Sequence, residues 1–182
     1  MKARRIYRLT PAEGFAFCEV QGSTKDDALD AIHAGLASKV PNFKVHLVDH
    51  DETGHLSAGD LPWLDSSVLV MTERSRQVLE AELRPFGFVV PLPCDEQPLS
   101  AFVTTVMSDA LDLERSDLSR LDNGSVIGVW KHVFAPEALP DAGVFGLSCL
   151  GPFGGLCFSE SVVATMRRHR LTGADFEEIW RG

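Results

Sequence analysis

Residues 49–60 form the segment whose spacing comes closest to that of a metal site. Acidic side chains stand at positions 1, 3 and 12 of this stretch, and a glycine stands at position 6. Calcium loops share this spacing, because their oxygen ligands must converge on a hard cation while the glycine makes the sharp turn. Position 5 is a threonine, and the residues before the segment have the pattern of a strand instead of a helix. We therefore expect a solvated acidic loop, and the alternative is a calcium site made by Asp49, Asp51, Thr53 and Asp60.

The histidines near this loop have no spacing that is typical of a zinc enzyme. His46, His50 and His55 lie on an expected strand and on the loop after it, whereas the zinc-binding histidines of many metalloproteases stand four residues apart on a helix. We expect ordinary surface or half-buried histidines here, and no metal.

A small hydrolase-type enzyme is a second alternative. Cys149 would become a nucleophile if the fold brought His132 or His169 beside it. Paired carboxylates could also share acid–base work, and the run that could supply them consists of Asp109, Asp112, Glu114 and Asp117. The glycine-rich segments lack the spacing of a nucleophile elbow or a phosphate loop. We therefore expect no catalytic residue and no cofactor.

The charge of the chain points to a protein partner. Its net charge is −9, which disfavours binding to nucleic acid and to anionic membranes, because both require clustered Lys and Arg. A basic protein would be attracted, since opposite potentials steer two proteins together. The acids gather in two stretches, 95–122 and 45–73, which contain few or no Lys and Arg.

Eleven residues in these stretches are our candidates for partner contact. In the first stretch they are Asp95, Glu96, Asp109, Asp112, Glu114, Asp117 and Asp122. In the second they are Asp49, Asp51, Glu52 and Trp63, the last because tryptophan is enriched at the energetic centres of interfaces.

Length and composition indicate an ordinary globular protein. The chain has 182 residues, of which 45% are hydrophobic and 24% are charged. This suits one domain over 1–182, with a possible small N-terminal lobe over 1–60 and a core over 61–182. The N-terminus lacks the apolar segment of a signal peptide, so we expect a cytoplasmic protein with four reduced cysteines.

Two strand-to-helix steps are the clearest structural signals. An apolar strand over 67–71 is followed by Thr72 and Glu73, and a second apolar strand is followed by Ser159 and Glu160. A hydroxyl at the N-cap and an acid in the first turn favour a helix after each strand. A third helix is expected over 24–37. Further strands are expected over 6–9, 15–20, 43–48, 86–92, 99–107, 126–134 and 144–150, with a short strand or coil over 176–180. The expected class is α+β, with a mainly antiparallel sheet and two or three helices packed on it.

Several of these segments together carry a family resemblance. They are residues 71–74 (Met-Thr-Glu-Arg) with the helix that follows, the strand over 88–92, and the segments 110–116, 156–160 and 171–176. In this combination the chain, from Trp63 onward, resembles the immunity proteins of bacterial polymorphic toxin systems, in particular immunity family 11. The resemblance implies a non-catalytic protein that binds and neutralises a cognate toxin, here by covering it with an acidic surface.

Overall fold

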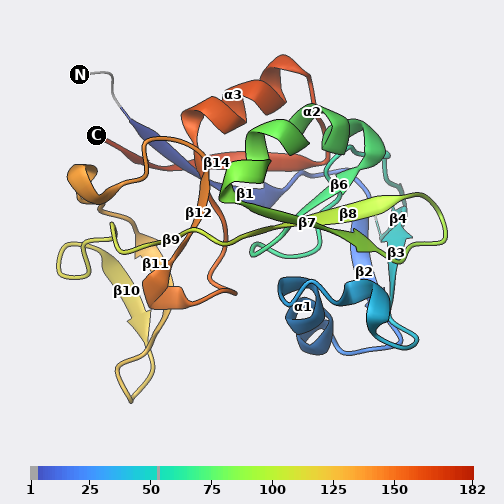
Figure 1. Ribbon diagram of the computed structural model, residues 1–182, viewed down its shortest axis with the longest axis horizontal. Helices are drawn as coiled ribbons and strands as arrows, with labels where there is room; N and C mark the ends of the chain where they lie inside the picture. The colour runs from blue at the N-terminus through green and yellow to red at the C-terminus, as the bar shows by residue number, and fades with distance from the viewer. Residues whose placement is uncertain (1–3, 53) are drawn as a thin grey trace.

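The protein has an α+β fold, as expected, and the computed structural model describes residues 4–52 and 54–182. Three helices occur in these residues (Figure 1): α1 (Lys25–His33), α2 (Glu73–Leu83) and α3 (Glu160–Arg168). None of the described helices is long and apolar enough to cross a membrane.

The strands form several sheets instead of one. The largest has the order β14 (Ala174–Arg181), β1 (Arg5–Pro11), β13 (Cys157–Ser159), β12 (Val144–Leu147) and β9 (Met107–Ser108). A second has the order β6 (Leu69–Thr72), β8 (Leu99–Thr104) and β7 (Gly87–Leu92). Three strand pairs complete the described part: β2 (Phe17–Gln21) with β3 (Lys44–Val48), β4 (His50–Asp51) with β5 (Gly54–His55), and β10 (Asp117–Arg120) with β11 (Val126–Lys131). Among these strands only β9 and β12 pair in parallel.

The first strand-to-helix step forms as predicted, and the second differs in one contact. Thr72 is the N-cap of α2, and its hydroxyl accepts a hydrogen bond from the Ser75 backbone at 3.5 Å. Ser159 stands at the N-cap of α3 but makes no capping bond. Its hydroxyl instead accepts a buried hydrogen bond from the Gly143 backbone N–H at 2.8 Å. That donor would otherwise be buried without a partner, which costs more than an uncapped, solvated helix end.

Several boundaries differ from those expected. Helix α1 ends at His33 instead of near residue 37, because Gly35 turns the chain with a φ of +71°. Strand β11 ends at Lys131 and β12 at Leu147, three residues earlier than expected in each case. The C-terminal segment is the longest of the described strands, β14 with eight residues, and seven residue pairs join it to β1.

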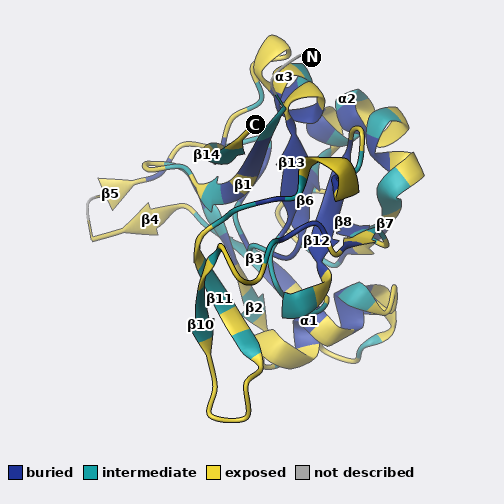
Figure 2. Ribbon diagram, turned by 90° about the vertical axis from the view of Figure 1, so that its left-hand side faces the viewer, coloured by how far each residue is buried: buried dark blue, intermediate teal, exposed yellow. Residues whose placement is uncertain are grey.

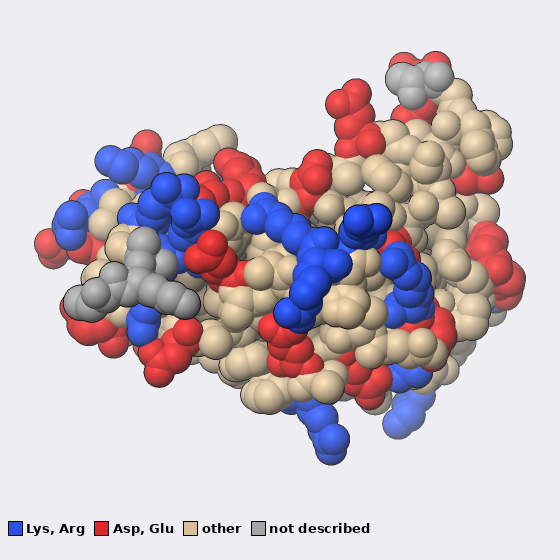
Figure 3. Space-filling view, turned by 90° about the horizontal axis from the view of Figure 1, so that it is seen from above, with Lys and Arg blue, Asp and Glu red and all other residues tan. Residues whose placement is uncertain are grey.

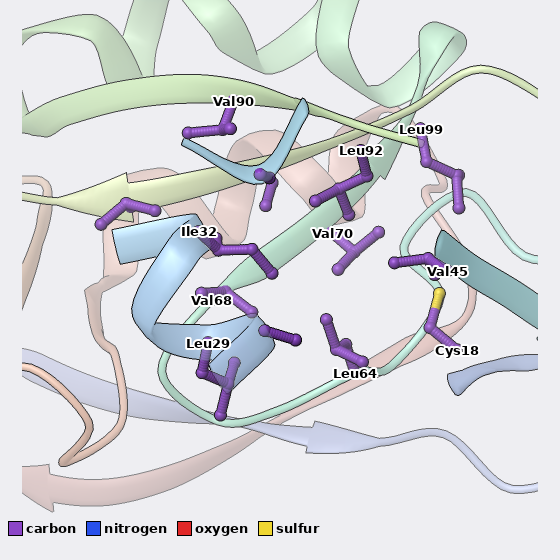
Figure 4. Close-up of a cluster of buried hydrophobic side chains, with 14 of the residues drawn as sticks. Cys18, Leu29, Ile32, Val45, Leu64, Val68, Val70, Val90, Leu92 and Leu99 are labelled. Carbon is purple, nitrogen blue, oxygen red and sulfur yellow. The ribbon is translucent and has the colours of Figure 1, made fainter. Parts of the chain in front are cut away.

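The three-stranded sheet separates two cores. Val68 and Val70 point to one side and Leu69 and Met71 to the other, as the two-residue period of a strand requires. On the first side lie α1 and the β2–β3 pair, whose buried residues include Leu29, Ile32, Cys18 and Val45 (Figure 4). On the second side lie α2, α3 and one face of the large sheet. A third core covers the opposite face of the large sheet, around Phe134, Phe145 and Cys157.

The first 60 residues share these cores with the rest of the chain. Strand β1 lies inside the five-stranded sheet, between β13 and β14. Leu29 and Ile32 of α1 pack in the same cluster as Val70 and Val103. This packing favours one cooperative unit, and the domain organisation itself stays a prediction.

Candidate functional site

The acidic residues that we expected to form one patch lie at separate ends of the molecule. Asp95 and Glu96 follow β7 and lie against β3, near the end that carries β4 (Figure 1). Asp117 and Asp122 belong to the β10–β11 hairpin, at the opposite end. Viewed from above, acidic side chains gather on the projection at the upper right, the end where β4 lies, while Lys and Arg lie over the middle of that face (Figure 3). The stretch 95–122 is therefore no continuous surface.

Several of the candidate acids are occupied within the protein. Asp95 pairs with Lys44 at 2.5 Å, and Glu96 pairs with His46. The Asp112 carboxylate accepts hydrogen bonds from two backbone N–H groups of its own turn, at 3.1 Å and 3.0 Å. These contacts stabilise loops, and such side chains would have to break them before they could meet a partner.

Among the candidate acids of the stretch 95–122, four remain exposed without a side-chain hydrogen bond or ion pair to any other described residue. They are Asp109, Glu114, Asp117 and Asp122. All four lie in or beside the β10–β11 hairpin, which Figure 2 shows projecting from the body at the bottom of the view. The acidic charge that is available for a partner is therefore concentrated at this end.

Trp63 is a structural residue, in contrast to our expectation. It is half-buried and packs against the core between the large sheet and α2. Its backbone carbonyl accepts a hydrogen bond from Cys18 at 2.6 Å. This side chain is held inside the fold, which makes it a poor candidate for the centre of an interface.

The β10–β11 hairpin carries the most exposed of the large apolar side chains in the described residues instead. Trp130 is 79% exposed, Ile127 57% and Leu121 51%. Leu118 and Val129, which pair across the two strands, point inward and pack on the core beside Phe134. The sequence did contain a signal, because residues 126–130 place apolar side chains on both faces of β11, the second strand of the hairpin. Only one face of such a hairpin can be buried.

A groove of about 650 Å³ separates this hairpin from the large sheet. Its walls are mainly apolar, and include Leu9, Leu150, Phe153, Trp130 and Ile179. This volume is in the range of ligand-binding clefts. The groove gives the hairpin a second apolar surface beside Trp130.

Polar groups occur at one side of the groove. The Arg8 guanidinium, which lines the groove, pairs with Glu177 at 2.7 Å. Burial, together with the nearby Arg8 charge, lowers the pKa of His132 to about 4, while Glu177 opposes this effect. His132 is therefore neutral at physiological pH and does not supply a positive charge.

The cysteines lack the surroundings of a nucleophile. Burial raises the pKa of Cys149 and raises that of Cys157 to about 12. Within the described residues no hydrogen bond joins Cys149 to His132 or His169. A thiol in such surroundings is mostly protonated at neutral pH, and the thiolate is the reactive form.

The stretch expected as a possible calcium loop is a β-hairpin. Strands β4 and β5 pair His50 with His55 and Asp51 with Gly54, and Thr53 lies outside the described residues. The Asp60 carboxylate binds elsewhere, to Arg74 at 2.5 Å and to the backbone N–H of Thr172 at 3.1 Å. Asp60, the twelfth position of that loop, therefore holds the start of α2 against the loop before β14 and is engaged away from the hairpin.

Asp49 is grouped with two histidines instead. One potential ligand atom from each of Asp49, His50 and His55 lies within 4.8 Å of the others, and all three residues are exposed. No metal was expected at these histidines, because they lack the helical spacing of a zinc enzyme; the pairing of β4 with β5 sets His50 opposite His55 instead.

Comparison with known proteins adds no assignment to these surfaces. No protein-family model matches the sequence, and no curated protein matches it.

Proposed function

We propose that this protein acts by binding and blocking another protein, and that its partner is a basic bacterial toxin domain. The observation that carries the proposal is the β10–β11 hairpin, which exposes Trp130, Ile127 and Leu121 beside an apolar groove. Contiguous exposed apolar surface rimmed by polar residues is typical of interaction sites. The hairpin keeps its own inward face on the core, so its exposed face is not needed for folding.

The surroundings of the hairpin favour a basic partner. Asp109, Glu114, Asp117 and Asp122 are exposed around the apolar side chains and have no described side-chain partner. An apolar centre with a charged rim is the usual construction of an interface. The acidic rim would accelerate encounter with a positively charged surface, and the apolar centre would supply most of the affinity.

The resemblance to polymorphic-toxin immunity proteins supplies the class of partner. In this proposal the protein is not an enzyme, works in the cytoplasm and acts by occlusion. The partner's target would then be cytoplasmic as well, and a nuclease-like toxin with a basic surface would fit the acidic rim.

The direct test uses the C-terminal domain of a toxin encoded next to the gene of this protein. We expect the two chains to co-purify from a co-expressing strain, and we expect cells that express the toxin domain to grow when the protein is present. The matched control is Leu36→Ala, which removes an exposed apolar side chain that belongs neither to the hairpin nor to the lining of the groove. That variant should rescue growth fully. A toxin domain that stays free and lethal in the presence of the folded protein would contradict the proposal.

A further inference from the structure

A second site lies on the β4–β5 hairpin, away from the partner-binding surface. His50 and His55 are directly opposite each other on the two strands. Their rings are in contact, with centroids 4.8 Å apart and an angle of 60° between the ring planes. Directly opposed residues on paired strands keep their side chains on the same face. The register of the hairpin therefore holds the two imidazoles together.

A carboxylate orients one of these rings. The Asp49 Oδ1 atom lies 2.7 Å from His50 Nδ1. Metal-binding histidines usually donate one ring N–H to a carboxylate, which fixes the tautomer and leaves the other nitrogen as the ligand. In the free protein this contact holds the Asp49 carboxylate against the His50 ring, so both groups are already on the side of the hairpin where His55 lies.

The donor set selects the kind of cation. Two imidazoles and a carboxylate suit zinc and its neighbours among the transition metals, whereas calcium and magnesium prefer oxygen ligands alone. Ligand atoms around a tetrahedral zinc ion are about 3.3 Å apart, since each lies about 2.0–2.1 Å from the metal. The candidate ligand atoms of this group already lie within 4.8 Å of one another. Because the side chains are exposed, small rotations can close the remaining gap.

We propose that Asp49, His50 and His55 form a binding site for a zinc-type divalent cation, with water completing the coordination. The cation would join the two strands of a hairpin whose ladder contains only two residue pairs. It would also reduce the negative charge at this end of the molecule. The site is independent of the β10–β11 surface, so neither proposal depends on the other.

Calorimetric titration of the full chain with zinc chloride, after removal of any polyhistidine tag, tests the site. We expect one zinc ion to bind per chain, and calcium chloride to give no heat. The double variant His50→Asn/His55→Asn should weaken zinc binding at least tenfold. The matched control is His46→Asn, because His46 is partly exposed but pairs with Glu96 in the loop between β7 and β8, and this variant should bind zinc as the original chain does.

A second measurement keeps the test independent of hairpin folding. In a ¹⁵N-labelled sample, zinc should shift the imidazole resonances of His50 and His55 and leave those of His132 and His169 unchanged. Absence of zinc binding by the original chain would overturn the proposal. Unchanged zinc binding by the double variant, or zinc shifts confined to other histidines, would overturn it as well.

Discussion

Trp130 is the single side chain on which partner binding should depend most. It is 79% exposed in the free protein, so its truncation should cost the fold little, whereas an aromatic anchor buried in an interface commonly contributes 2 kcal/mol or more. We expect Trp130→Ala to raise the Kd for the toxin domain by at least about thirtyfold, since 1.4 kcal/mol is a factor of ten. Surface plasmon resonance measures this, with Leu36→Ala as the control. Equal losses in both variants would argue against a binding surface on the hairpin.

His132 makes the stability of the protein depend on pH. Burial lowers its pKa to about 4 in the folded state, and its pKa in the unfolded chain is about 6.5. Between these values the unfolded chain binds more protons, so the free energy of unfolding falls as the pH drops from about 6.5 to about 4.

Replacing this histidine should remove part of that dependence. We expect the loss of stability between pH 7 and pH 5 to be smaller in His132→Gln by on the order of 1 kcal/mol, after allowance for solvent screening at a half-buried site. Urea unfolding at both pH values measures it. Some dependence should remain, because burial also lowers the pKa of His33. If the two proteins lost the same stability, burial of His132 would not be the cause.

At the scale of elements, the two strand-to-helix steps should respond differently to loss of their hydroxyl groups. Thr72→Ala removes a long capping bond of 3.5 Å and should cost about 0.5–1 kcal/mol. Ser159→Ala leaves the buried Gly143 N–H without an acceptor and should cost about 1–3 kcal/mol. Thermal unfolding of the two variants compares them. A larger loss in the Thr72 variant would show that Ser159 acts as an ordinary cap.

Local signals predicted the elements well and their partners poorly. The helix start at Thr72 and Glu73 is decided by neighbours in the chain, and it forms as expected. The pairing of β1 with β14 joins residues such as Arg8 and Glu177, which are 169 positions apart. No local pattern contains that information, which is why the strands were assigned to one sheet.

The candidate site shows the same limit. The sequence identified the acidic stretch but could not show that Asp95 meets Lys44, far from Asp117. The sequence also favoured Trp63 over Trp130. The exposure of each tryptophan depends on which face of its segment packs on a core, and this is decided by contacts between distant parts of the chain. His50 and His55 meet because the register of the β4–β5 hairpin sets them opposite each other. That register depends on the length of the turn between them, which the sequence did not reveal.

Across the whole molecule, only one of the acidic ends should steer the partner. Asp117 and Asp122 lie beside the exposed hairpin, whereas Asp95 lies toward the β4 end and pairs with Lys44. We expect Asp117→Asn/Asp122→Asn to lower the association rate several-fold at low salt, and the difference to shrink as salt rises. Stopped-flow mixing with the toxin domain measures the rates, and Asp95→Asn is the control. A salt-independent rate would remove the steering argument.

The central position of β1 has a consequence for how the protein is made. Its neighbours β13 and β14 are translated long after it, so in a ribosome-bound chain β1 lacks both of its strand partners until those residues emerge. Folding of the large sheet is then a late event, and the nascent segment is an early substrate for chaperones. A stalled or prematurely terminated product that lacks residues 174–181 would leave one side of β1 unpaired and invite degradation.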